Sequence, residues 1–334
     1  MSQHHFPFVS VIMPIRNEVE YVERSLSAVL RQDYPEDRFE VIVADGTSTD
    51  GTLQIIWKIQ SKWPQLRLVE NPGKIVATGL NAAISRARGE VIVRVDGHCE
   101  IAPHYVRRCV EHLRSENSSV VGGPIETVGE TPLARVIAAA MSSPFGVGNS
   151  AFRTTRHKTL LVDTVPFPAY KRSVIEEAGF ADEELVRNQD DEYNYRIRKL
   201  GGRVLLAADV TSRYYSRSTL FSLARQYYQY GYWKVRVLQK HPHQMSLRQF
   251  VPPAFVASLM ISLALISWQG SPIPLLFILV PYGLANLGAS LWTAHMQGWG
   301  KIFLLPVVFA ILHLGYGLGF LWGLLRFSRR WLRD

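Results

Sequence analysis

The sequence FEVIVADGTSTDGT, residues 39–52, decides the fold because it joins three structural signals in one short stretch. Its first part, Phe39–Ala44, is a mostly apolar run with the length of a buried strand. A turn-rich stretch, Asp45–Gly51, comes next, and a segment with helical character, Thr52–Trp63, follows it. A strand, a turn and a helix in this order predict one α/β unit.

Similar patterns lie on both sides of this unit. We predict the strands Phe8–Pro14, Leu66–Val69 and Val91–Val95 and the helices Glu18–Arg31 and Ile75–Arg88. Strands that alternate with helices predict a mainly parallel sheet with right-handed crossovers. Ligands of such sheets bind outside the carboxyl ends of the strands, which is where Asp45 and Asp96 fall.

The composition changes along the chain and predicts three parts. Residues 1–210 carry the α/β pattern. Residues 211–249 mix aromatic and cationic side chains, which is typical of a segment at a membrane interface, although an ordinary surface helix is the alternative. Residues 250–334 are apolar, and they predict a membrane domain with two or three transmembrane or re-entrant helices. Its candidate spans, none of which contains Asp, Glu, Lys or Arg, are Val251–Trp268, Ile273–Trp292 and Ile302–Leu325.

Charge and cysteine content indicate the compartment and the partners. The net charge of +9 favours an anionic partner, but no recognised nucleic-acid motif is present and the basic residues adjoin apolar spans, so we expect no nucleic acid. Cys99 and Cys109 are too few for a disulfide framework, which fits a reducing compartment. Because Met1–Phe8 does not resemble a signal peptide, we expect the front part on the cytoplasmic side of the inner membrane. Three full spans would place the C-terminal arginines on the opposite side, against the positive-inside rule, so a re-entrant segment stays open.

Five polar segments follow predicted strands or open predicted helices. Taken singly, each fits a turn or a helix cap: Asp50 suits an N-cap, and acidic residues at the start of a helix are favoured by its dipole. The same dipole also keeps a carboxylate ionised, as a general base requires. The segments are Pro14–Glu18, Asp45–Thr52, Asn71–Lys74 with Gly79–Ala83, Arg94–His98 and Asn188–Glu192.

In this order the segments resemble the inverting family-2 glycosyltransferases, over roughly residues 8–235. The resemblance implies an α/β GT-A nucleotide-diphospho-sugar transferase domain, followed here by an α-helical membrane domain. It also implies a donor site for a UDP-sugar and a divalent cation, Mn²⁺ or Mg²⁺, held by Asp96 and His98. Two positions depart from the family pattern, because Gly46 replaces the second Asp of one motif and His98 the last Asp of the metal motif. The implied donor-binding residues are Pro14, Arg16, Asn17, Glu18, Asp45, Lys74, Asn81 and Asp96.

The resemblance places the catalytic base and the acceptor side further along the chain. Gln189-Asp190 matches the motif whose Asp is the base, so Asp190 is the candidate and Asp191 its nearest rival. The implied acceptor-side residues are Ala169, Tyr170, Gln189, Gln226, Tyr230 and Trp233. Because the stretch from Gln226 to Tyr230 lacks the Arg-Trp of processive synthases, a single-sugar transferase is expected.

Within this family the chain looks closest to succinoglycan-type exopolysaccharide glucosyltransferases. We therefore expect a membrane-bound hexosyltransferase that moves one hexose, glucose being the expected sugar, from a UDP-sugar to a lipid-linked saccharide in exopolysaccharide or cell-surface glycan synthesis. Transfer to polyprenyl phosphate is one alternative. A non-catalytic membrane scaffold that keeps the fold is another, although it would be expected to lose some of Asp45, Asp96 and Asp190, and all are present. The sequence leaves the linkage and the oligomeric state open.

Overall fold

A computed structural model of the chain describes residues 6–148 and 150–331 and divides it into two compact units. The first unit comprises Met1–Glu126 and Thr155–Tyr214, and the second comprises Thr127–Thr154 and Tyr215–Asp334. The second unit therefore includes residues 127–154, which lie inside the range 1–210 predicted for the catalytic domain. These residues form α5 (Pro132–Met141), α6 (Pro144–Val147) and α7 (Ala151–Thr154). The apolar helix α5 packs against a long helix of the same unit, α13 (Leu305–Arg326).

The first unit is built on a sheet of eight strands in the order β3-β2-β1-β4-β9-β6-β10-β8. β1, β2, β3 and β4 pair in parallel, as do β6 and β10, whereas β9 runs antiparallel to β4 and β6 and β8 antiparallel to β10. The sheet is thus mainly parallel, as the sequence predicted. The strands are β1 Val9–Ile15, β2 Phe39–Asp45, β3 Leu66–Glu70, β4 Val91–Arg94, β6 Val120–Gly122, β8 Leu160–Leu161, β9 Ala169–Lys171 and β10 Val204–Leu206.

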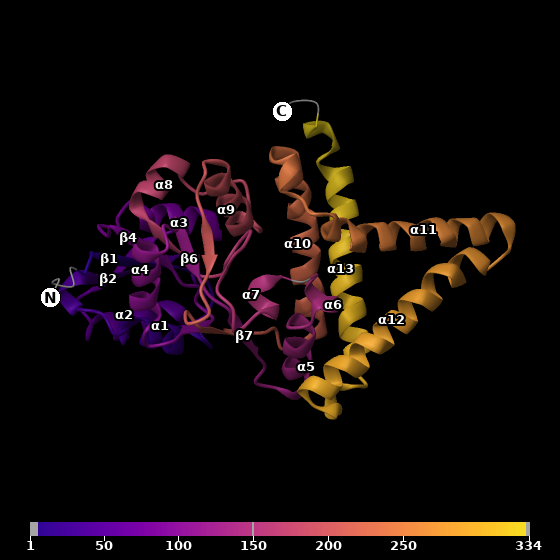
Figure 1. Cartoon of the computed structure of the whole chain (residues 1–334), viewed down its shortest axis with the longest axis horizontal. Coiled ribbons are helices and arrows are strands. Elements are labelled where there is room, and N and C mark those ends of the chain that lie inside the picture. Colours follow the sequence, from indigo (N-terminus) through magenta and orange to yellow (C-terminus); the bar gives the residue numbers. More distant parts are fainter. Residues whose placement is uncertain (1–5, 149, 332–334) are drawn as a thin grey trace. The chain divides into compact units, whose positions relative to one another are not determined.

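Helices cover this sheet and bury its central strands, and Figure 1 shows them around it. Every residue of β1 and β2 is buried, which explains why these strands read as continuous apolar runs. α3 packs against β1 and β2, and α4 packs against β6 and β9. A small sheet also pairs β5 (Cys99–Ile101) with β11 (Ser212–Tyr215), antiparallel. The helices of this unit are α1 Val22–Leu30, α2 Thr52–Gln60, α3 Val76–Ile84, α4 Tyr105–Ser115, α8 Arg172–Ala178 and α9 Gln189–Lys199.

The second unit is helical. Its most extensive interface between helices joins α10 (Leu220–Lys240) to α13, and the two helices lie side by side in Figure 1. Glycines let these two backbones approach closely. A Cβ added at Gly319 would lie 2.0 Å from the carbonyl oxygen of Tyr228, and one added at Gly231 would lie 2.0 Å from that of Tyr316. Small residues at a helix interface serve close packing in this way in membrane proteins.

Three helices of the second unit are long and apolar enough to cross a membrane: residues Leu247–Gln269, Ile273–Gln297 and Leu305–Arg326. The first contains α11 (Val251–Gln269) and the second is α12 (Ile273–Gln297). Large apolar side chains on α11 and α12 are exposed, among them Leu263, Phe277 and Leu284. Apolar side chains in this number on a protein surface indicate contact with lipid. The chain is accordingly a membrane protein by the character of these helices.

Polar groups inside these helices find partners within the unit. The hydroxyl of Tyr282 lies 3.1 Å from Nδ1 of His313, and Nε2 of His313 lies 2.8 Å from the carbonyl oxygen of Phe145. A carbonyl can only accept a hydrogen bond, so Nε2 carries the proton and Tyr282 donates to Nδ1. α12 and α13 are thus linked by a hydrogen bond in a region where unpaired polar groups are costly.

Candidate active site

The carboxyl ends of β2, β1 and β4 bring the first predicted segments together. These strands are neighbours in the sheet, and Ile15 pairs with Asp45 across β1 and β2. On the other side of β1, Ile12 pairs with Arg94 at the end of β4. The segments after the strands, which start at Arg16, Gly46 and Val95, therefore leave the sheet at one edge, as the alternating pattern predicted.

Hydrogen bonds tie the loop after β1 to the loop after β2. Asp45 is buried, and its carboxylate accepts hydrogen bonds from the backbone N–H of Ser48 at 3.0 Å and from the Ser48 hydroxyl at 2.6 Å. Ser48 Oγ in turn accepts from the backbone N–H of Asn17 at 2.9 Å, and Oδ1 of Asn17 accepts from the N–H of Thr49 at 2.9 Å. Asn17 thus helps to hold the turn that presents Asp45.

The turn after Asp45 ends at a helix cap. The N-cap of α2 is Gly51, whose φ of 98° lies in the left-handed region that glycine tolerates. Asp50 accepts a hydrogen bond from the backbone N–H of Thr52 at 3.1 Å. Its other oxygen accepts from the N–H of Val19 at 3.2 Å. Asp50 therefore fixes the start of the helix and the neighbouring loop from the position before the cap.

Arg94 and Asp96 form an ion pair at the end of β4. Nε and Nη2 of Arg94 donate to the two carboxylate oxygens of Asp96 at 2.9 and 3.2 Å. Burial works to raise the pKa of Asp96, but the charges of Arg94, His98 and Arg187 and the hydrogen bond from Arg94 together outweigh it and hold the pKa below the ordinary value of 3.8. Asp96 is therefore ionised and negatively charged at neutral pH. Arg94 was not among the predicted site residues, although an arginine at the end of an apolar strand is a signal for a functional role.

Asp190 lies at the start of α9 and differs from Asp96 in its electrostatics. Burial raises the pKa of Asp190 above its ordinary value of 3.8, and the positive charge of Arg94 opposes this only in part. Its Oδ1 accepts a hydrogen bond from the backbone N–H of Asp191 at 3.0 Å. Arg94 therefore acts on both acids, because Asp96 and Asp190 both raise the pKa of its guanidinium against the effect of burial. A partly buried acid with a raised pKa suits a group that takes up a proton.

His98 faces Glu18 across the end of the sheet. Nδ1 of His98 lies 2.8 Å from Oε1 of Glu18, and the ring meets the Tyr214 ring edge-on with centroids 5.2 Å apart. Burial works to lower the pKa of His98, but Glu18, Tyr214 and Asp96, with Glu18 the largest of the three, together outweigh it and raise the pKa to about 9. His98 and Asp96 each shift the pKa of the other, so their charges lie close together.

These residues fit a cation that also binds a substrate diphosphate. Within residues 6–148 and 150–331, no cluster of three or more His, Cys, Asp or Glu side chains forms a complete metal cage. Asp96 supplies carboxylate oxygens and His98 an imidazole nitrogen, which are two ligands. Mg²⁺ in particular is commonly held by one or two protein groups together with substrate phosphates. The donor set therefore suits a shared cation.

The other predicted donor-binding residues lie around the same edge. Pro14 is buried in β1, and the exposed Arg16 donates from Nη1 to the carbonyl oxygen of Lys74 at 3.5 Å. Asn81 is different, because its amide is used by the protein: Nδ2 donates to the carbonyl oxygen of Ala181 at 2.9 Å, and Oδ1 accepts from the Ala181 N–H at 2.9 Å. Asn81 thus holds the loop that leads toward α9, and a direct contact with the donor stays a prediction.

The predicted acceptor-side residues fall in both units. In the first, Ala169 and Tyr170 are buried in β9, and the Tyr170 hydroxyl donates to Oδ1 of Asn194 at 3.4 Å. Oε1 of the buried Gln189 has no hydrogen-bond partner within the described chain, so it is available to a ligand. In the second unit, α10 carries Gln226, Tyr230 and Trp233. Gln226 donates to the Tyr230 hydroxyl at 2.9 Å, and the ring of Trp233 packs against that of Phe327.

Backbone strain gathers in the same loops. Non-glycine residues with a positive φ are uncommon, and they concentrate where structure serves function. All but Asn117 and Phe167 of those found in the described chain lie in the predicted segments. They are Asn17, Thr47, Lys74, Asn117, Phe167 and Asn188, with φ between 46° and 62°.

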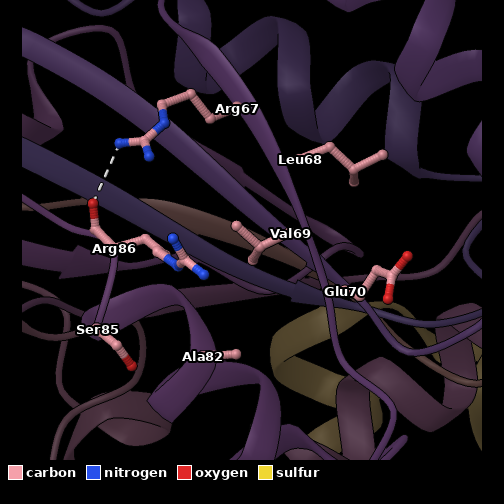
Figure 2. Close-up of a pocket in the computed structure, with 7 residues that line it drawn as sticks. All are labelled: Arg67, Leu68, Val69, Glu70, Ala82, Ser85 and Arg86. Atoms are coloured by element: carbon pink, nitrogen blue, oxygen red, sulfur yellow. Dashed lines mark hydrogen bonds between the residues drawn. The ribbon is translucent and has the colours of Figure 1, made fainter.

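A surface pocket of the first unit lies away from these residues. It is a cavity of about 600 Å³ between β3 and the end of α3, and Figure 2 shows the side chains around it. Arg67 donates to the carbonyl oxygen of Arg86 at its rim. None of the predicted site residues lines this pocket, so its size carries no argument for the active site.

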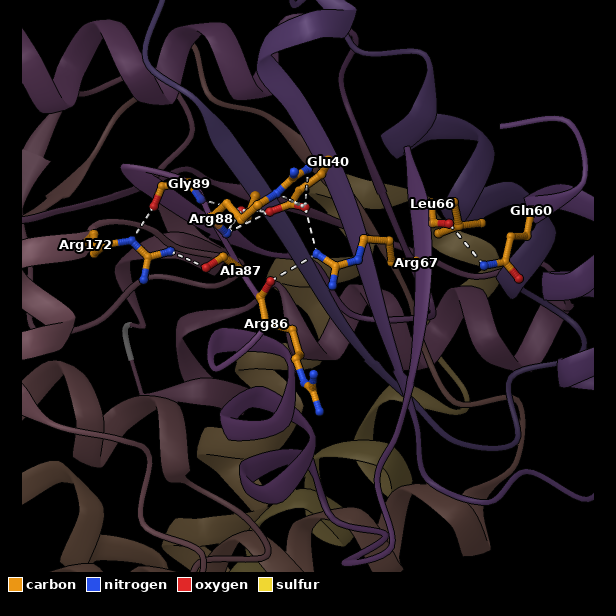
Figure 3. Close-up of polar contacts among 10 residues, drawn as sticks. Glu40, Gln60, Leu66, Arg67, Arg86, Ala87, Arg88, Gly89 and Arg172 are labelled. Carbon is orange, nitrogen blue, oxygen red and sulfur yellow. Dashed lines mark hydrogen bonds and ion pairs between the residues drawn. The ribbon is translucent and has the colours of Figure 1, made fainter. Parts of the chain in front are cut away.

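Next to this pocket, a buried glutamate joins the amino ends of the strands, as Figure 3 shows. Glu40, near the start of β2, accepts hydrogen bonds from the Ser10 hydroxyl at 2.7 Å and from the Arg88 backbone N–H at 2.8 Å. The guanidinium groups of Arg88 and Arg67 donate to its second oxygen at 3.1 and 3.2 Å. Burial works to raise the pKa of Glu40, but these hydrogen bonds outweigh it and lower the pKa below the ordinary 4.5. Arg172 also donates to the carbonyl oxygens of Gly89 and Ala87, which closes the same loop.

Comparison with known proteins assigns the family. The chain belongs to glycosyl transferase family 2, whose family model matches residues 10–179. The protein is therefore a glycosyltransferase with a GT-A fold, and its C-terminal helices include three candidate membrane spans.

Its relatives include proteins of polysaccharide and lipid-linked sugar synthesis. The succinoglycan biosynthesis protein ExoA of Rhizobium meliloti (strain 1021) is 29% identical over 336 residues, which cover 96% of each chain. A protein of Methanococcus voltae named dolichyl N-acetyl-alpha-D-glucosaminyl phosphate 3-beta-D-2,3-diacetamido-2,3-dideoxy-beta-D-glucuronosyltransferase is 26% identical over 241 residues, 70% of this chain and 74% of that one. Among solved structures, the mannosyltransferase PcManGT from Pyrobaculum calidifontis, in complex with GDP-Man and Mn²⁺, shares the fold. Its TM-score is 0.62 at 21% identity, over 93% of this chain and 88% of that chain.

Proposed function

We propose that this protein transfers a single hexose, with glucose the expected sugar, from a UDP-sugar to a lipid-linked saccharide with inversion at the anomeric carbon. The reaction would take place at the cytoplasmic face of the inner membrane, during the synthesis of an exopolysaccharide or another cell-surface glycan. The observation that carries the proposal is a pair of partly buried acids in different protonation environments, both within the electrostatic reach of Arg94. Arg94 keeps Asp96 ionised, whereas burial raises the pKa of Asp190.

Each acid then has a separate role. Asp190 accepts the proton of the acceptor hydroxyl as the hydroxyl oxygen attacks the anomeric carbon. The new carbon–oxygen bond forms on the face opposite the diphosphate, the bond to the diphosphate oxygen breaks, and its electron pair leaves with UDP. A single displacement of this kind inverts the anomeric centre. Asp191, the next residue on α9, is the rival for this role.

Asp96 and His98 belong to the leaving-group side. They would hold a divalent cation, Mn²⁺ or Mg²⁺, which supplies positive charge to the departing diphosphate. The complex of PcManGT with GDP-Man and Mn²⁺ supports the use of such a cation in this fold. Asp45, at the end of β2, is assigned to the nucleoside of the donor, and Lys74 and Arg16 are the cations assigned to its phosphates.

The acceptor assignment rests on the second unit. Its three long apolar helices hold the protein at the bilayer, and α10 carries aromatic and cationic side chains that suit lipid headgroups and a pyrophosphate. The similarity to the succinoglycan biosynthesis protein supports an acceptor within exopolysaccharide assembly.

A second candidate acceptor is polyprenyl phosphate itself. The printed name of the Methanococcus voltae relative describes a lipid phosphate that already carries a sugar, so it supports a lipid-linked saccharide as acceptor. Bare polyprenyl phosphate would also need an acceptor site that faces the membrane, and it therefore stays the second candidate. With this acceptor the enzyme would start a glycan chain instead of extending one.

A comparison of acceptors tests the proposal. The full chain in nanodiscs would receive labelled UDP-glucose and one of three acceptors: a polyprenyl-pyrophosphate saccharide, bare polyprenyl phosphate or the free oligosaccharide. We expect the lipid-linked saccharide to be the best acceptor and its product to be inverted. Equal use of the free oligosaccharide would defeat the lipid-acceptor assignment, and preference for polyprenyl phosphate would favour the second candidate. A retained configuration would rule out the single displacement, and no transfer to any acceptor would favour the non-catalytic scaffold.

A further inference from the structure

The bond between Glu18 and His98 decides which ring nitrogen of the histidine remains for a ligand. Nδ1 lies 2.8 Å from Oε1 of Glu18. An ionised carboxylate only accepts hydrogen bonds, so Nδ1 carries the proton of this bond. Nε2 is then the nitrogen that can offer a lone pair to a cation, once the cation has displaced the proton that this nitrogen carries in the imidazolium. The two residues are 80 positions apart in the sequence, so only the fold brings them together.

Other contacts hold this pair in place. The backbone N–H of Glu18 donates to the Thr52 hydroxyl at 2.9 Å, which fixes the loop from which the glutamate extends. A Cβ on Gly97 would lie 2.9 Å from Cγ of Glu18, so the glutamate can approach only because residue 97 is glycine. The Tyr214 ring packs against the imidazole in a T-shaped contact and limits its rotation.

We propose that Glu18 is a positioning residue, which holds His98 with Nε2 free to bind the divalent cation of the donor diphosphate. This inference rests on the proposed function, which assigns His98 and Asp96 to that cation. A histidine that binds a metal commonly donates its other N–H to a carboxylate, which fixes the tautomer and makes the ligand more basic. Glu18 thereby acts on the donor through His98 and not by direct contact.

Glu18 matches a histidine and would not match an aspartate at position 98. An aspartate has no tautomer to fix, and its charge would lie beside another carboxylate, where like charges repel. The effect of removing Glu18 should therefore depend on which residue occupies position 98. A residue that served only to fold the loop would show no such dependence.

A double-mutant cycle on cation binding tests the inference. The full chain in detergent, with UDP present, would be titrated with Mn²⁺ by calorimetry. Glu18→Ala should weaken Mn²⁺ affinity roughly 10–100-fold. In the His98→Asp background the same change should cause no weakening. Glu18→Gln, which keeps an oxygen that accepts from Nδ1, should retain more affinity than Glu18→Ala and provides a second variant if the alanine variant does not fold. Glu20→Ala, at an exposed position nearby, is the matched control and should bind Mn²⁺ as the wild type does.

Spectroscopy and Asp96→Ala separate the possible failures. Pulsed electron paramagnetic resonance of the bound Mn²⁺ should show nitrogen from an imidazole in the wild type and lose it in His98→Asp. If Asp96→Ala weakens Mn²⁺ binding but Glu18→Ala does not, or if Glu18→Ala acts equally in both backgrounds, the role of Glu18 is wrong and the proposed function stands. If Asp96→Ala and His98→Asp both leave Mn²⁺ binding unchanged, the cation site is wrong and the inference is overturned with it.

Discussion

The strand β2 carries a buried acid near each end, and the protein treats the two differently. At its amino end, Glu40 accepts hydrogen bonds from a hydroxyl, a backbone N–H and two guanidinium groups. At its carboxyl end, the hydrogen bonds that the described chain gives to the Asp45 carboxylate come from one residue, Ser48. A buried acid surrounded by donors is part of the scaffold, whereas one with few donors has capacity left for a ligand.

The remaining acids extend this comparison between the two edges of the sheet. Asp190, assigned to the carboxyl edge, is partly buried and has a raised pKa, whereas the pKa of the fully buried Glu40 is lowered. The strained residues Asn17, Thr47 and Lys74 also follow strand ends at the carboxyl edge. The amino edge should therefore control stability, and the carboxyl edge should control activity.

The largest effect is expected from removing the cation. Excess chelator should abolish sugar transfer, and Asp96→Ala should weaken binding of the UDP-sugar, because the cation compensates the charge of the diphosphate. Chelation should leave the melting temperature unchanged, whereas Asp96→Ala should also lower it, because the buried guanidinium of Arg94 loses its ion-pair partner. Transfer assays with and without chelator, with Mn²⁺ added back, would check this. Full activity in excess chelator would remove Asp96 from the proposed mechanism.

Glu40→Gln should destabilise the first unit and leave the chemistry intact. The amide keeps the shape of the carboxylate but loses its charge-assisted bonds to Arg88 and Arg67. Its NH2 group also replaces an accepting oxygen, so it faces hydrogen-bond donors from which it cannot accept. We expect the free energy of unfolding to fall by roughly 1–3 kcal/mol. Denaturant unfolding of the purified protein measures this, and transfer per folded molecule should stay near the wild-type rate. A fall in the catalytic rate without a fall in stability would contradict the division between the two edges.

Acidic pH should reduce the contribution of Glu40 to the free energy of unfolding. Because its folded-state pKa lies below the ordinary value of 4.5, its stabilising effect is complete above about pH 4.5 and disappears as the pH falls through the folded-state pKa. The difference in unfolding free energy between the wild type and Glu40→Gln should therefore be constant near neutral pH and shrink in acid. A difference that grew as the pH fell would show that folding raises the pKa of Glu40 instead of lowering it.

The smallest effect is expected at the surface of the same cluster. The side chain of Arg88 is 67% exposed, so water can replace much of what its guanidinium gives to Glu40. Arg88→Ala should cost about 0.2–1 kcal/mol, since the backbone N–H of residue 88 remains as a donor. Melting temperatures of Arg88→Ala and Glu40→Gln, measured side by side, would rank the two variants by stability. A larger loss for Arg88→Ala would mean that the exposed ion pair dominates the cluster.

Much of the fold could be predicted because its signals are local. Phe39–Ala44 and Phe8–Pro14 are continuous apolar runs, since both faces of β1 and β2 are covered, and the turns after them carry polar residues. The GT-A fold and its family were therefore confirmed. The long spans near the C-terminus were equally visible, because about 20 apolar residues suffice to identify a candidate span.

The contacts around these elements could not be predicted, because they join distant residues. Nothing in the sequence pairs Glu40 with Arg88, or Glu18 with His98, since a polar residue in an apolar strand does not identify its partner. The assignment of residues 127–154 to the helical unit depends on α5 packing against α13, which follows far later in the chain. The roles of the site residues themselves stay predictions.

The central claim is that the carboxyl edge of the sheet performs the chemistry through Asp190, and one paired measurement tests it. Transfer rates at saturating UDP-sugar and melting temperatures would be compared for Asp190→Asn and Glu40→Gln. Removal of a general base lowers the rate roughly 10²–10⁴-fold. Burial disfavours the charged form of Asp190, so Asp190→Asn should melt at or above the wild-type temperature at neutral pH, while Glu40→Gln should melt lower and keep its rate. An Asp190→Asn variant that transfers sugar at the wild-type rate would contradict the account.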